Sequence, residues 1–184
     1  MQESGHQPER FTARDRVIAG YAAIAIAVHV LEAGIPSPLP GVKPGLANII
    51  VLLALLRHGI SVGIQVSLLR VLVGSLVIGT FMTPTFMLSL AGALASLAVL
   101  VAGVQVPRRL LGPIGLAVLA ALAHMTAQFL LAWSVFIPHT ALLNLLPLLL
   151  LAALLSGLAT GILAAKLLDR MERIAPTGAG GHAG

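Results

Sequence analysis

Apolar residues fill six runs along this 184-residue chain, and short polar or proline-containing stretches separate the runs. A bilayer core of about 30 Å is crossed by roughly 20 helical residues, and five of the runs approach or exceed that length. The breaks contain helix-ending residues, such as Gly59, Pro107 and Pro138. The pattern therefore predicts six membrane-spanning helices, over residues 17–34, 45–57, 60–78, 85–101, 113–136 and 141–168.

The composition supports an all-α, polytopic membrane protein. Hydrophobic residues make up 58% of the chain and charged residues only 9%, whereas a soluble domain carries about 25% charged residues. Cysteine is absent, which excludes disulfides, thiolate metal sites and iron–sulfur clusters. The net charge of +5 does not indicate nucleic-acid binding, because the basic residues cluster at the ends of the apolar runs. We expect the lipid bilayer to be the main partner and expect no cofactor.

The distribution of Lys and Arg predicts the orientation, since basic residues are retained on the cytoplasmic side. With the N-terminus inside, one side carries nine of them: Arg10, Arg14, Arg16, Arg57, Arg108, Arg109, Lys166, Arg170 and Arg173. The other side carries only Lys43. We therefore expect a multi-pass protein of the cytoplasmic (inner) membrane with both termini cytoplasmic. Residues 1–16 form its N-terminal segment, 17–168 its transmembrane domain and 169–184 a disordered tail.

The stretch from Glu32 to Asn48 contains four of the chain's prolines and precedes the shortest predicted helix. That helix, over 45–57, spans only about 20 Å. The stretch is therefore expected to dip into the protein from the outer side, where irregular backbone is tolerated if it lines a cavity. Short, Pro/Gly-interrupted segments also indicate transporter binding sites. The alternative is a tilted helix with an ordinary loop.

Arg70 lies near the middle of the third predicted helix, where an ionisable side chain is costly and usually faces the protein interior. By helical spacing it shares a face with Gly63, Ser67 and Gly74. Its guanidinium suits bidentate binding of a carboxylate or phosphate. An internal pair with Glu32 that fixes helix packing explains the residue equally well.

The first predicted helix has two distinct faces. His29 and Glu32 are three residues apart and share one face. Ala19, Ala23 and Ala27 form a small-residue stripe on roughly the opposite face, which allows close approach of another helix. That helix belongs either to this chain or to a partner protein. A second small-residue pair, Gly157-x-x-x-Gly161, predicts close packing of the sixth helix.

Further polar residues occur at middle depth in the predicted helices. His124 and Gln128 share a face of the fifth helix, and Asn48 opens the second. Each alone is most simply an interhelical hydrogen bond. At 1.5 Å per residue, however, they lie at about the depth of Arg70, His29 and Glu32. One outward-opening pocket is therefore expected, with substrate-binding candidates His29, Glu32, Lys43, Asn48, Arg70, His124 and Gln128. The candidate residues carry more positive than negative charge, which favours a small anionic or zwitterionic ligand.

The chain has no motif of an autonomous enzyme. A phosphate-binding Walker motif is absent. No paired carboxylates are present to hold magnesium and a diphosphate, and no nucleophile–base arrangement stands out. We therefore expect neither catalytic residues nor metal ligands, which leaves an accessory-subunit role open.

Several motifs are similar to those of one membrane-protein family. They occur in order over residues 17–168: Glu32-x-x-Ile35-Pro36, Gly41-Val42-Lys43-Pro44-Gly45-Leu46-Ala47-Asn48-Ile49, Ser67-Leu68-Leu69-Arg70-Val71-Leu72-x-Gly74-Ser75, Ser89-Leu90-Ala91-Gly92, Pro113-Ile114-Gly115 and Ala123-His124-x-x-x-Gln128. The chain thus resembles the Gx transporter family, which is also labelled heptaprenyl diphosphate synthase component I. Pro44 departs from the family pattern, which has Leu or a similar residue there.

That family resembles the substrate-binding S components of energy-coupling-factor vitamin transporters. The resemblance implies a six-helix bundle that captures a ligand from outside and docks on a transmembrane coupling subunit with ATPases. In such proteins an Ala-x-x-x-Ala stripe makes the docking contact, which Ala19, Ala23 and Ala27 match. The synthase label implies a different role, a non-catalytic membrane subunit in prenyl diphosphate synthesis or redox assembly. A structural anchor without a ligand is the third hypothesis.

Overall fold

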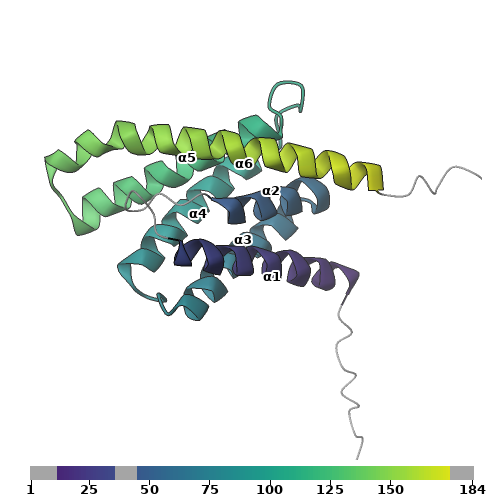
Figure 1. Cartoon of the computed structure of the whole chain (residues 1–184), viewed down its shortest axis with the longest axis horizontal. Helices are drawn as coiled ribbons and strands as arrows, with labels where there is room; N and C mark the ends of the chain where they lie inside the picture. Colours follow the sequence, from purple (N-terminus) through teal and green to yellow (C-terminus); the bar gives the residue numbers. More distant parts are fainter. Residues whose placement is uncertain (1–11, 36–44, 175–184) are drawn as a thin grey trace, which may run out of the picture.

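The computed structural model describes residues 12–35 and 45–174, which form an all-helical bundle. The helices are α1 (Ala13–Gly34), α2 (Leu46–His58), α3 (Ile60–Ile78), α4 (Pro84–Gly103), α5 (Pro113–Leu131) and α6 (Leu146–Ile174) (Figure 1). A π-helical turn, Ala132–Phe136, and a 3-10 helix, Thr140–Leu145, connect α5 to α6. The predicted fold class and its six helical segments are confirmed.

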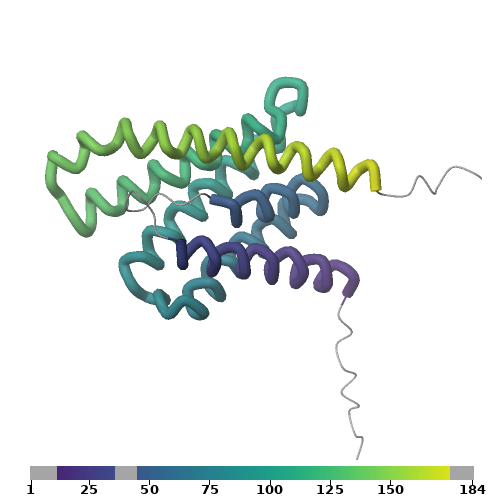
Figure 2. The backbone as a smooth tube through the Cα atoms, viewed as in Figure 1, coloured from purple at the N-terminus to yellow at the C-terminus, as the bar shows by residue number. Residues whose placement is uncertain are grey.

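Successive helices run up and down the bundle. The start of α1 and the end of α6 lie at the same end as the α2–α3 and α4–α5 connections, on the right of Figures 1 and 2. We call this the basic end, because these segments carry the Lys and Arg residues of the described ranges other than Arg70: Arg14, Arg16, Arg57, Arg108, Arg109, Lys166, Arg170 and Arg173. The fold thus places at one end of the bundle the basic residues that the sequence pattern assigned to one side of the membrane.

The short helix α2 is the centre of the bundle. Within the described residues, five helices are long and apolar enough to cross a membrane, and α2, with 13 residues, is shorter. It contacts α1, α3, α5 and α6, and most of its side chains are buried on all sides. A helix that is hydrophobic all round is stable only when it is enclosed. The other helices therefore separate α2 from lipid.

Close packing of α5 on α6 depends on two glycines. A Cβ atom added at Gly157 would lie 2.8 Å from the Val118 Cα, and one added at Gly161 would lie 2.8 Å from the Ile114 Cα. Both distances are shorter than a van der Waals contact, so only glycine allows the two backbones to approach this closely. The packing role predicted for the Gly157-x-x-x-Gly161 pair is confirmed.

Helix α6 ends six residues later than the sequence pattern indicated. The predicted helix stopped at Leu168 and a tail began at 169, but α6 continues to Ile174. The added residues include Asp169 and Arg173, whose side chains form an ion pair of 3.1 Å at i,i+4 spacing. Arg, Met and Glu, which make up four of the six added residues, are also good helix formers. The loss of apolar character at Asp169 thus marks the end of the apolar run and not the end of the helix.

We expect Gly157→Ala to destabilise the bundle by about 1–3 kcal/mol, because the new methyl group forces the α5 backbone away. Gly20→Ala is the matched control, since a Cβ at that exposed position of α1 meets nothing within 4 Å. The control should be neutral or more stable by about 0.5–1 kcal/mol. Thermal unfolding in mild detergent, followed by size-exclusion chromatography, measures both. Equal stability of the two variants would contradict the close α5–α6 contact.

Candidate functional site

The Glu32 carboxylate connects the end of α1 to the start of α2. Oε1 accepts a hydrogen bond of 2.6 Å from the Leu46 amide, and Oε2 a longer one of 3.4 Å from the Ala47 amide. These are the first two residues of α2, whose N–H groups have no partner within the helix. A carboxylate there also offsets the positive end of the helix dipole. Glu32 is 4% exposed; its bond to Ala47 is buried and its bond to Leu46 is partly buried.

Gly45 makes this capping arrangement possible. Its backbone has φ of +72°, in the left-handed region where side chains are disfavoured, and α2 begins at the next residue. Gly45, the N-cap residue, has no side chain that could accept a hydrogen bond from the first amides of α2. The Glu32 carboxylate provides the acceptor that an N-cap side chain usually provides.

Arg70 is buried in the middle of α3 without a bonded counter-charge. It is 5% exposed, and its Nε has no hydrogen-bond partner. Within residues 12–35 and 45–174, no carboxylate lies within 4.0 Å of its guanidinium. Glu32 is near enough for its charge to act on Arg70, but its hydrogen bonds go to α2. The two residues are electrostatic neighbours and do not form the direct salt bridge that one interpretation of the sequence required.

Two histidines each pack on a glycine of a neighbouring helix. The His29 ring of α1 lies where a Cβ at Gly74 of α3 would be, 2.7 Å from its Cδ2. The His124 ring of α5 occupies the corresponding space at Gly92 of α4, at 2.7 Å. Larger residues at these glycines would displace the rings.

The cluster is one electrostatic unit formed by three helices. Arg70 and His29 are both close enough to act on His124. The His124 Nδ1 is buried and has no hydrogen-bond partner in the part of the chain that is described. Glu32 and Arg70 are buried and the two histidines are half-buried, and we refer to Glu32, His29, Arg70 and His124 together as the buried cluster. Four of the seven residues expected at one pocket are therefore neighbours.

The remaining expected residues do not join the buried cluster. Asn48 lines a cavity of about 30 Å³ between α2, α4, α5 and α6, together with Gly45, Ser156 and Thr160. That volume suits one or two water molecules, and no member of the buried cluster lines it. Gln128 is half-buried one turn beyond His124, and Lys43 lies outside the described residues. No three His, Asp or Glu side chains among the described residues are placed to hold a metal ion.

The alanine stripe of α1 faces away from the bundle. Ala19, Ala23 and Ala27 are exposed, whereas Ile18 and Ala25 face the interior. The possibility that another helix of this chain covers the stripe is therefore wrong for the described part of the bundle. Small side chains on this face leave a smooth surface that a helix outside the chain can approach closely.

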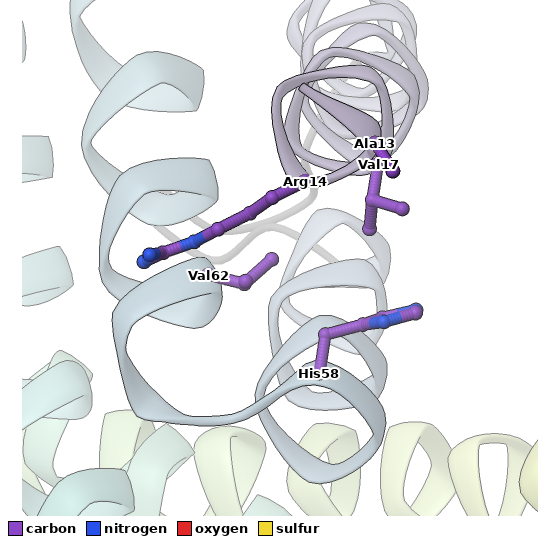
Figure 3. A pocket seen from close by; sticks show the side chains of 5 residues that line it. All are labelled: Ala13, Arg14, Val17, His58 and Val62. Atoms are coloured by element: carbon purple, nitrogen blue, oxygen red, sulfur yellow. The ribbon is translucent and has the colours of Figure 1, made fainter.

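A second pocket, which the sequence pattern did not reveal, lies at the basic end (Figure 3). Its volume is about 240 Å³, and it is lined by Ala13, Arg14, Val17, His58 and Val62. Arg14 Nη2 donates a 2.5 Å hydrogen bond to Ser61 Oγ. In the sequence Arg14 and His58 indicated only the ends of apolar runs. The sequence signal that could have revealed the pocket is the presence of a polar residue at the start of α1, at the end of α2 and at the start of α3, the three helix ends that converge there.

These features define a class, the multi-pass helical membrane proteins with a polar cluster in their interior. A family described as heptaprenyl diphosphate synthase component I matches residues 21–167, and the chain belongs to this family. By this description, the members of the family are components of a synthase. No curated protein matches the chain, and no solved structure does.

Replacing Glu32 should loosen the junction between α1 and α2. We expect Glu32→Ala to lower stability by about 1–2 kcal/mol, the usual effect of losing a helix cap. Glu32→Gln should fall between Ala and the wild type, since its amide oxygen still accepts a bond but carries no charge. Glu172→Gln, on the exposed end of α6, is the control for loss of one acid. Thermal unfolding in detergent ranks the variants. If Glu32→Ala matches the control, Glu32 is not a cap.

Proposed function

We propose that this protein captures a small anionic molecule within the membrane, in the manner of an S component, and that it is not itself a catalyst. The observation that supports this most directly is the state of Arg70. Its Nε is buried without a partner, while the nearest carboxylate, Glu32, is bonded to the amides of α2. The buried cluster therefore retains the capacity to bind an anion.

Electrostatics favours an anionic ligand over an empty site. A buried charge without a bonded partner is strongly destabilising, and charged residues within the bilayer usually mark ligand pathways. A guanidinium binds a carboxylate or phosphate in bidentate fashion, and the His124 Nδ1, which has no hydrogen-bond partner among the described residues, offers a further nitrogen atom. Arg70 lies about 15 Å from the start of α3, close to the bilayer midplane, where transporters place their ligands.

The direction of capture follows from the positive-inside rule. If the basic end faces the cytoplasm, the junction of α1 and α2 at Glu32 faces the outside. A ligand would then enter near Glu32 and reach Arg70 from the outer surface. The exposed stripe of Ala19, Ala23 and Ala27 is the surface that we assign to a transmembrane coupling subunit with ATPases.

A second function is favoured by the family description, which names a component of a prenyl diphosphate synthase. On that basis the chain would be a non-catalytic membrane subunit that associates with a synthase or takes part in membrane redox assembly. Purification from native membranes in mild detergent separates the two proposals. Recovery of a coupling subunit with ATPases supports capture, and recovery of a prenyl synthase supports the accessory role.

Binding to Arg70 can be tested by ligand-dependent stabilisation. We expect one or more vitamins or small carboxylates and phosphates to raise the unfolding temperature of the wild type, since a ligand at 100 times its Kd adds about 2.7 kcal/mol. Arg70→Ala should lose this response, and Arg70→Lys should keep part of it, because a single ammonium replaces the bidentate guanidinium.

The control is Arg109→Ala, which removes an exposed charge from the α4–α5 connection and should respond like the wild type. If Arg70→Ala unfolds, Arg70→Lys and Gly92→Ala, which displaces His124, still report on the site. The capture proposal fails if no ligand of the panel stabilises the wild type, or if all Arg70 and Gly92 variants respond fully.

A further inference from the structure

The pocket at the basic end is distinct from the buried cluster. It lies where the start of α1, the end of α2 and the start of α3 converge. Figure 3 shows the Arg14 side chain reaching from α1 towards α3, with Val62 beside it, while His58 and Val17 lie on the opposite side. None of the five lining residues belongs to the buried cluster.

Two kinds of surface meet in this pocket. Ala13, Val17 and Val62 form apolar walls, and the methylene stem of Arg14 extends them. Arg14 and His58 supply the polar groups. The guanidinium uses one N–H group for Ser61 Oγ out of the five that it carries. His58 packs edge-on against Tyr21, with ring centroids 5.2 Å apart, which fixes one side of its ring.

The charge around the pocket is positive. Arg14, Arg16 and Arg57 belong to the helix ends that form it. The neighbouring acid, Asp15, is engaged in a capping box with Thr12, so its carboxylate is directed to the start of α1. A cationic rim above an apolar wall suits an amphiphile with a negative headgroup.

The start of α3 adds backbone donors. Its N-cap is Gly59, and no side chain caps the helix there. The first amides of α3 therefore lack intrahelical acceptors and carry the positive end of the helix dipole. Val62, which lines the pocket, belongs to this first turn. Helix amides together with an arginine are the usual donors for a phosphate group.

We propose that this pocket binds a phosphate group at the membrane surface, contributed either by the headgroup of an anionic phospholipid or by a soluble phosphate ester. The phosphate contacts Arg14 and His58, and a lipid's apolar part follows Ala13, Val17 and Val62. Bound there, the phosphate bridges α1 to the α2–α3 connection. The site requires neither the ligand nor the orientation proposed for the buried cluster.

The test uses the full-length protein in mild detergent and three probes: phosphatidylglycerol, diacylglycerol with the same acyl chains, and glycerol phosphate. Native mass spectrometry measures binding, and thermal unfolding measures stabilisation. We expect phosphatidylglycerol to bind and stabilise the wild type, and diacylglycerol, which lacks the phosphate, to do neither. Arg14→Ala should weaken phosphatidylglycerol binding about tenfold, the typical effect of losing a charged hydrogen bond.

A pocket-filling variant separates the pocket from its charge. Ala13 is exposed at the start of α1, so Ala13→Trp should fold, fill the pocket and abolish binding while every charge is kept. Arg109→Ala removes an equal charge from the same end of the bundle and should bind like the wild type. If Arg14→Ala does not fold, Ala13→Trp decides the question.

Each outcome discriminates. Binding of phosphatidylglycerol alone identifies a lipid site, and binding of glycerol phosphate with the same sensitivity to Arg14→Ala and Ala13→Trp identifies a site for soluble phosphate esters. Both support the proposal. Equal weakening by Arg14→Ala and Arg109→Ala would show only a general surface charge and would overturn it. Full binding by Ala13→Trp, or equal binding of diacylglycerol and phosphatidylglycerol, would also overturn it.

Discussion

The bonds from Glu32 to the first amides of α2 are the interaction on which the rest of this bundle depends. Inside a membrane no water is available to satisfy backbone donors at a helix start. The fold places such a start within the protein, because α2 is too short to reach from one surface to the other. A buried carboxylate from α1 satisfies those donors. In doing so it is no longer available as a bonded partner for Arg70, whose buried Nε is left without a hydrogen-bond partner.

Much of this architecture could be predicted from the sequence. Apolar runs and their polar breaks are direct consequences of the bilayer's thickness, so the six helices, including the short second one, were predicted, with the largest shift of bounds in α6. The end of α6 was missed because hydropathy reports where a helix leaves the membrane and is insensitive to an ion pair such as Asp169–Arg173 that extends the helix beyond it. Gly157 and Gly161 were predictable as packing residues, because only close backbone contact favours glycine in a helix interior.

The interior polar groups were harder to predict. Helical spacing identified Glu32, His29, Arg70 and His124 as inward-facing, but it could not show which of them bond to one another. Depth along a helix is one coordinate, and Asn48, which was expected at the depth of Arg70, lines a cavity that Arg70 does not line. Which group Glu32 bonds depends on where the start of α2 lies relative to the end of α1, and helical spacing within α1 does not give that. The pocket near Arg14 forms where the start of α1 meets the α2–α3 connection, and Arg14 and Ser61 are 47 residues apart, so no local pattern revealed it.

The enclosed position of α2 also bears on how the protein is made. A segment of 13 residues is shorter than the stretch that normally enters the lipid as an independent unit. Its start is neutralised by a residue of the preceding helix, and its sides are covered by helices that are mostly synthesised later. We therefore expect α2 to gain a stable place in the bilayer only after α3 and the α5–α6 hairpin have been synthesised, so that insertion of this central helix and folding of the bundle are one event.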